Sequence, residues 1–157
     1  MFSDDGATVL LVEDSPDDLE LTLRALARVG ASARVEVARD GVEALDFLFG
    51  TGQHRRREPG RLPRLVLLDV KLPRLGGIEV LRRVKAHPRT RHLPVVMLTS
   101  SAEDTDVDAC YEAGANSYVV KPVGIGEFYA AVGGIGEYWL SINRAHGVPA
   151  ARPLGVS

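Results

Sequence analysis

The sequence predicts an α/β fold: a doubly wound, flavodoxin-like sheet of five parallel strands in the order 2-1-3-4-5, with an extended C-terminal helix. Two observations support this fold class. Short apolar runs alternate along the chain with segments of helical period, which is the pattern of repeated βαβ units. In runs such as residues 9–12 and 65–68 every position is apolar, as expected for strands that helices cover on both faces.

The strands are predicted at residues 8–13, 34–38, 65–69, 95–99 and 117–120. The first helix is predicted at residues 16–29, because Ser15 is a favourable N-cap and Gly30 a favourable stop. Asp40 is expected to cap the second helix. The third and fourth helices are predicted at residues 78–86 and 105–113.

The C-terminal helix is the least regular predicted element. Its apolar residues recur at spacings of three and four, namely Phe128, Ala131, Val132, Ile135, Tyr138, Trp139 and Ile142. Three glycines lie among them, and each disfavours a helix by about 1 kcal/mol, so either packing holds the helix together or it breaks there. Packing on the sheet explains the first half. Tyr138, Trp139 and Ile142 extend past the sheet and predict a partner surface.

Length and composition narrow the possibilities. The 157 residues suit one domain, residues 1–144, followed by a flexible tail at residues 145–157. A net charge of −2 argues against nucleic acid or an anionic membrane as the main partner. Cys110 is the single cysteine, and no signal peptide or membrane-spanning run is visible, so we expect a cytoplasmic protein.

Three carboxylates follow two of the predicted strands. Asp69 ends the run at residues 65–68, and Glu13 and Asp14 follow the run at residues 9–12. The carboxyl ends of parallel strands meet at one edge of the sheet, where such folds bind ligands. Crowded carboxylates repel one another unless a cation lies between them, and oxygen ligands without Cys or His suit Mg²⁺. We therefore expect a Mg²⁺ site there, with Asp69 as candidate nucleophile.

Two further strand ends add a hydroxyl and an amine to the same edge. Thr99 ends the fourth predicted strand, and Lys121 follows the fifth. A phosphorylated Asp69 would need both, as a hydrogen-bond donor and a charge partner for the new phosphoryl oxygens. Asp18 is interpreted as a first-turn acid that favours the helix dipole.

With Glu13, Asp14, Asp69, Thr99 and Lys121 in this order and spacing, the chain resembles the receiver domain of two-component response regulators. The resemblance covers nearly the whole chain and implies a CheY-like form of the fold. It also implies that Asp69 is the phosphoacceptor, that Glu13 and Asp14 are Mg²⁺ carboxylates, and that Lys121 contacts the phosphoryl group.

The same resemblance assigns further residues. It makes Lys71 a metal ligand through its backbone carbonyl, and Thr99 and Tyr118 the switch residues. It also implies a cis peptide bond between Lys121 and Pro122. Within the family, the polar insertion at residues 51–64 and the aromatic C-terminal helix are similar to the small regulators that partner bacterial phytochrome kinases. The implied phosphoryl donor is therefore a sensor histidine kinase, possibly a phytochrome.

Several functions compete at this stage. The leading hypothesis is a stand-alone response regulator that is not an enzyme acting on outside substrates; a phosphate sink and a degenerate receiver scaffold are alternatives. A Mg²⁺-dependent phosphohydrolase of the haloacid dehalogenase type would need an acid two residues after Asp69, where this chain has Lys71. A homodimer is also predicted, formed by the fourth helix, the fifth strand and the last helix, with Tyr138, Trp139 and Ile142 in its interface.

Overall fold

The structure is a computed structural model, and it describes residues 8–28, 34–52 and 62–147. These residues form one parallel sheet in the order β2-β1-β3-β4-β5, so the predicted fold class is confirmed. The strands are β1 (Thr8–Val12), β2 (Arg34–Ala38), β3 (Leu65–Leu68), β4 (Val95–Thr99) and β5 (Ser117–Val120). The predicted bounds of the second, fourth and fifth strands match the structure at both ends.

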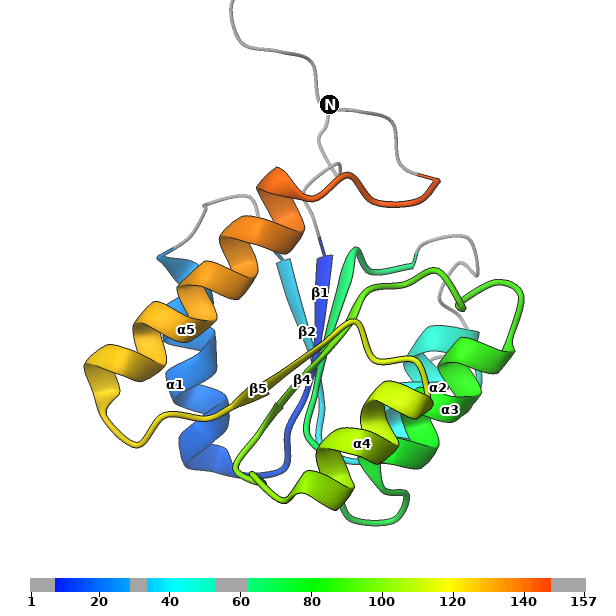
Figure 1. The fold of residues 1–157 in the computed structure, drawn as a ribbon. Helices are drawn as coiled ribbons and strands as arrows, with labels where there is room; N and C mark the ends of the chain where they lie inside the picture. The colour runs from blue at the N-terminus through cyan, green and yellow to red at the C-terminus, as the bar shows by residue number, and fades with distance from the viewer. Residues whose placement is uncertain (1–7, 29–33, 53–61, 148–157) are drawn as a thin grey trace, which may run out of the picture.

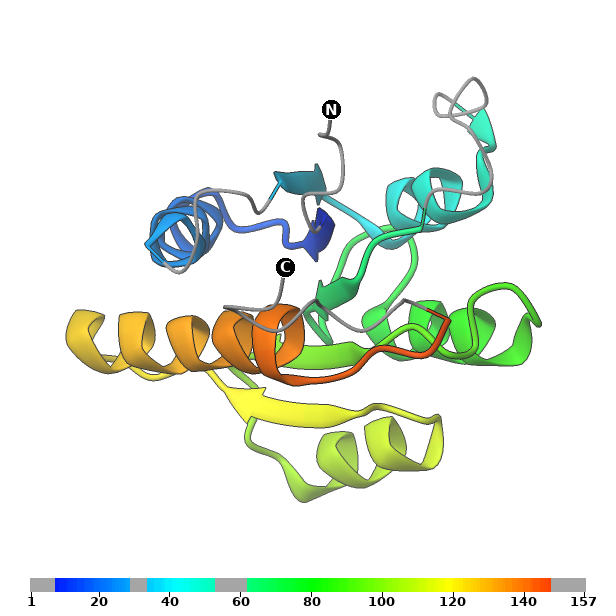
Figure 2. The same ribbon diagram turned by 90° about the horizontal axis from the view of Figure 1, so that it is seen from above.

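Helices cover both faces of the sheet. They are α1 (Pro16–Ala27), α2 (Gly41–Phe49), α3 (Gly77–Ala86), α4 (Asp104–Glu112) and α5 (Ile125–Glu137), and a short π-helix at Tyr138–Ile142 continues α5. α1 and α5 lie on one face, and α2, α3 and α4 lie on the other (Figure 1, Figure 2). This three-layer arrangement leaves the carboxyl edge of the sheet open between the two groups of helices.

The predicted helix starts are largely confirmed by their caps. The Ser15 hydroxyl accepts a hydrogen bond from the backbone N–H of Asp18 at 3.3 Å, and the Asp40 carboxylate accepts one from Glu43 at 2.8 Å. Each cap satisfies a backbone donor that the first helical turn leaves unpaired. α1 ends at Ala27, and the predicted stop at Gly30 lies outside the described residues.

The consecutive apolar positions of the strands feed two separate core layers. One layer, under α2, α3 and α4, contains Leu10, Val12, Val66, Leu68, Val95 and Met97 from the sheet. The other, under α1 and α5, contains Val9, Leu11, Leu65, Leu67, Val96 and Leu98. Successive strand residues point to opposite faces, so the central strands β3 and β4, which are covered on both sides, are buried at every position.

α5 is continuous through its glycines, so the alternative of a break there is wrong. α1 holds it: Phe128, Val132 and Ile135 are buried in the layer that also contains Leu19 and Leu26 of α1. The guanidinium of Arg28 also lies 4.3 Å from the centre of the Tyr129 ring. Packing against a neighbouring helix therefore outweighs the low helix propensity of glycine.

The aromatic end of this helix divides between the core and the surface. Trp139 packs against the core layer under α1 and α5, whereas Tyr138 and Ile142 are 46% and 63% exposed. Residues 148–157 of the predicted tail and residues 53–61 of the predicted insertion lie outside the described part of the chain. Among the described helices, none is both long and apolar enough to cross a membrane.

Candidate functional site

The strand register brings the predicted acids together. Val12 of β1 is paired with Leu68 of β3, so the residues that follow, Glu13 and Asp69, leave the sheet side by side. Two backbone hydrogen bonds extend the ladder past the strand ends: Asp69 N–H donates to the Val12 carbonyl at 3.2 Å, and Lys121 N–H donates to the Thr99 carbonyl at 2.8 Å. The predicted meeting of four strand ends at one edge is confirmed.

A cavity of about 450 Å³ opens at this edge. Its lining includes all the predicted site residues of the strand ends, namely Glu13, Asp14, Asp69, Lys71, Thr99 and Lys121. Tyr118 and the aromatic end of α5 are not among its lining residues. Of the two predicted switch residues, Thr99 therefore lies in the cavity with the acids, and Tyr118 lies outside it.

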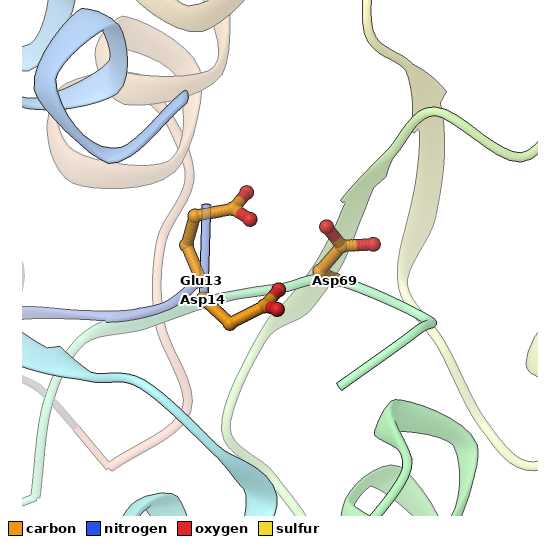
Figure 3. A group of neighbouring side chains, drawn as sticks. All are labelled: Glu13, Asp14 and Asp69. Carbon is orange, nitrogen blue, oxygen red and sulfur yellow. The ribbon is translucent and has the colours of Figure 1, made fainter. Parts of the chain in front are cut away.

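Glu13, Asp14 and Asp69 form an acidic group suited to a metal ion. Each offers one carboxylate oxygen, and these oxygens all lie within 4.8 Å of one another. Figure 3 shows the three side chains facing a common space from the ends of β1 and β3. Glu13 and Asp69 are buried, whereas Asp14 is exposed. Hard oxygen donors with one open side fit Mg²⁺, which keeps several waters and accepts a phosphoryl oxygen.

Lys121 is the positive centre of the site. Its side chain is 5% exposed, and its ammonium lies 2.5 Å from Glu13 Oε1, 2.8 Å from Asp18 Oδ2 and 3.1 Å from Asp69 Oδ2. Burial alone would lower the pKa of this ammonium, but the hydrogen bonds to Asp18 and Glu13 raise it above its usual value. Lys121 therefore stays protonated beside Asp69 at any physiological pH.

Burial has the opposite effect on the acid. It raises the pKa of the Glu13 carboxyl above its usual value, although Lys121 opposes the shift. Both carboxylate oxygens of Glu13 accept hydrogen bonds: Oε1 from Lys121, and Oε2 from the backbone N–H of Ser15 at 3.1 Å. Desolvation is costly for a carboxylate, and these two donors offset part of that cost for the buried Glu13.

The loop after Asp69 folds back closely on the Asp69 backbone. Gly77 N–H donates to the Val70 carbonyl at 2.8 Å, and a Cβ on Gly77 would lie only 1.9 Å from the Asp69 carbonyl oxygen. Only glycine fits so close an approach. Lys71 N–H lies 3.4 Å from Asp69 Oδ1; the metal-ligand role of the Lys71 carbonyl stays a prediction.

Thr99 and Tyr118 meet at the same short loop. The Thr99 hydroxyl is buried and accepts from Ser101 N–H at 3.4 Å, and the Tyr118 hydroxyl donates to the Ser101 carbonyl at 2.8 Å. The Ser101 hydroxyl in turn donates to Asp106 of α4 at 2.5 Å. A movement of Thr99 can therefore reach Tyr118 and α4 through one residue.

One prediction about this site is wrong and one residue was missed. The peptide bond between Lys121 and Pro122 is trans, not cis; trans is the isomer that such bonds generally favour, and with it Lys121 reaches all three carboxylates. Asp18, interpreted as a simple helix-dipole acid, is one of those three. The sequence signal that could have found it is the position of Asp18 in the first turn of α1, which begins soon after β1 ends at Val12.

Comparison with known proteins identifies the protein family. Residues 9–133 match the family model of the response regulator receiver domain. This match covers most of the chain, and the chain belongs to that family. Receiver domains serve two-component signalling as phosphoacceptors rather than as enzymes with outside substrates.

Three known proteins illustrate the similarity. It is 42% identical to the probable methanogenesis regulatory protein FilR2 of Methanothrix harundinacea, over 92% of this chain and 91% of that protein. The structure of the phosphorylated cyanobacterial phytochrome response regulator RcpA superposes with a TM-score of 0.84 at 34% identity, over 89% of this chain and 98% of the other. The bacteriophytochrome response regulator RtBRR gives 0.71 at 48% identity, over 90% and 84%.

Proposed function

We propose that this protein is a stand-alone response regulator in which Asp69 accepts a phosphoryl group from a sensor histidine kinase in a Mg²⁺-dependent reaction. The contact between Lys121 and Asp69, beside the acidic group of Glu13 and Asp14, carries the proposal. It supplies a nucleophile, a fixed positive charge and a place for a divalent cation at one edge.

The transfer can be written with these residues. An oxygen of the Asp69 carboxylate attacks phosphorus and forms a P–O bond while the P–N bond to the donor histidine breaks, and the leaving imidazole takes a proton. Lys121 and the Thr99 hydroxyl are placed to bind phosphoryl oxygens as their charge develops. Bound Mg²⁺, held by Glu13, Asp14 and Asp69, would neutralise charge shared by the carboxylates and the phosphoryl group.

The competing functions are weaker. Lys71 occupies the position where a phosphohydrolase of the haloacid dehalogenase type needs an acid. Nothing favours a degenerate scaffold, because every residue proposed for phosphorylation is present at the carboxyl edge. A phosphate sink accepts the phosphoryl group by the same chemistry. It differs from a regulator only because it drains phosphate from the kinase and passes no signal to a downstream target.

The chemistry is tested by labelling with radioactive acetyl phosphate in Mg²⁺. The wild type should take up label, and Asp69→Asn should take up none because it lacks the nucleophile. Asp108→Asn, an exposed acid on α4, is the matched control and should label as the wild type does. Equal labelling of Asp69→Asn and the wild type would remove Asp69 from its proposed role.

We also propose a phytochrome kinase as the donor in the cytoplasm. Support comes from RcpA and RtBRR, whose names describe phytochrome response regulators. Transfer from phosphorylated kinases decides it: a phytochrome kinase should label the protein faster than sensor kinases of other classes. Faster transfer from a kinase without a phytochrome sensor would contradict this donor while leaving Asp69 chemistry intact.

Assembly as a homodimer through α4, β5 and α5 is a further proposal. Three exposed apolar side chains support it, Val120 of β5 and Tyr138 and Ile142 beyond α5. We expect Tyr138→Ala/Ile142→Ala to sediment as a monomer at a micromolar concentration at which the wild type is a dimer. Trp139 is left unchanged because it packs on the core. A monomeric wild type would exclude this interface.

A further inference from the structure

Asp18 has no assigned role in the proposed phosphoryl transfer, yet it holds the amine that the reaction needs. Its carboxylate lies 2.8 Å from the Lys121 ammonium. The lysine side chain is 5% exposed and the Asp18 side chain 32%. Asp18 therefore joins the buried ammonium to the molecular surface from the first turn of α1.

The three carboxylates around Lys121 are not equivalent. An ammonium has three N–H donors, and here each has a carboxylate partner: Glu13, Asp18 and Asp69. Glu13 and Asp69 belong to the acidic group suited to a metal ion, and Asp69 is also the proposed nucleophile. Asp18 is outside that group.

The reaction would change the partners of the first two carboxylates. A cation at the acidic group competes with Lys121 for the Glu13 oxygens, one of which already accepts from Ser15 N–H. Phosphorylation converts one Asp69 oxygen into an acyl phosphate oxygen. Of the three anchors, Asp18 alone keeps a full carboxylate charge with no second task.

We propose that Asp18 is a positioning residue: it anchors the Lys121 ammonium beside Asp69 while Glu13 and Asp69 engage the cation and the phosphoryl group. A fixed donor avoids reorganisation when charge develops on the phosphoryl oxygens. This inference rests on the proposed function, since it assigns Asp18 a task in the same transfer.

The chain provides a closely matched control. Asp17 is exposed and lies in the same first turn of α1, and it is not one of the three carboxylates that contact the Lys121 ammonium. Asp17→Asn and Asp18→Asn each remove one negative charge near the positive end of the same helix, so any effect through the helix dipole is shared. The difference between the two variants isolates the contact with Lys121.

Labelling by acetyl phosphate at saturating Mg²⁺ tests the inference. We expect the maximal rate to fall roughly tenfold in Asp18→Asn, the effect of losing one charge-assisted hydrogen bond, with little change in the acetyl phosphate concentration that gives half-maximal rate. Asp17→Asn should label at the wild-type rate, and Asp18→Glu, which keeps the charge, should recover part of the loss.

A second background shows whether Asp18 acts through Lys121. In Lys121→Met, adding Asp18→Asn should cause no further loss, because contacting residues are non-additive when one acts through the other. A tenfold loss in that background, or equal rates for Asp17→Asn and Asp18→Asn, would overturn the inference. A wild type that takes up no label would instead contradict the proposed function.

Discussion

The interior of the sheet and its carboxyl edge are made by the same strands, one residue apart. Leu68 is 1% exposed and packs in an apolar layer; Asp69, the next residue, faces two more carboxylates and an ammonium. Burial of Leu68 stabilises the fold, whereas burial of Asp69 and Glu13 opposes it unless partners compensate. On β1 and β3, the apolar residues that stabilise the fold and the acids proposed for the reaction are therefore neighbours in sequence.

The largest expected effect tests the interior. Leu67 is fully buried under α1 and α5, and Leu67→Ala should lower the free energy of unfolding by about 4 kcal/mol through lost transfer energy and a cavity. Urea denaturation measures the loss. At low temperature, where the variant is folded, Asp69 should still be labelled; loss of labelling in the folded variant would show that the reaction depends on this apolar packing as well.

The next effect tests the edge. Lys121→Met removes the cation shared by three carboxylates, and without Mg²⁺ it should cost about 3 kcal/mol, because the remaining charges are left unpaired. Calorimetry with chelator present measures the change. Saturating Mg²⁺ should restore part of the loss. Full stability in chelator would show that the edge does not depend on this lysine.

Mg²⁺ itself should stabilise the folded protein. A ligand at a hundred times its dissociation constant contributes about 2.7 kcal/mol when it binds only the folded state. The thermal midpoint should therefore rise with Mg²⁺ in the wild type and hardly change in Asp14→Ala, which lacks one predicted ligand. An equal rise in both proteins would place the ion elsewhere.

The smallest expected effect concerns the loop after β4, where Ser101 contacts both Thr99 and Tyr118. Tyr118→Phe removes one hydrogen bond to the Ser101 carbonyl, which is worth about 1 kcal/mol. Denaturation should show this small loss while acetyl phosphate labels Asp69 at the wild-type rate. A slower rate would mean that Tyr118 belongs to the reactive centre and not to the switch alone.

Sequence reasoning succeeded where one local pattern has one physical meaning. A fully apolar run needs two covered faces, which made the first and third strands predictable. Right-handed crossovers gave the strand order, and acids at the ends of parallel strands meet at the carboxyl edge. Only the last strand residue was misjudged: Glu13 and Asp69 were counted in strands that end one residue earlier.

Prediction from the sequence failed where one residue makes both a local interaction and a contact with a residue far away in the chain. The first turn of a helix is a good place for any acid, so Asp18 had a sufficient local explanation. Its contact with Lys121 depends on how α1 starts beside the end of β5. Trp139 is the converse case: spacing put it past the sheet, and only the packing of α5 along α1 returns it to the core.

The hydrogen bond between Lys121 and Glu13 spans 108 positions of the chain. A chain emerging from the ribosome exposes Glu13, Asp14 and Asp69 long before Lys121 has been synthesised. Domains generally fold as units, and Lys121 directly follows β5, the last strand of this sheet. A partly made or truncated chain would thus carry Asp69 without the ammonium that lies beside it in the folded protein. If Lys121 serves the proposed phosphorylation of Asp69, that reaction requires a chain that has been synthesised beyond β5 and has folded.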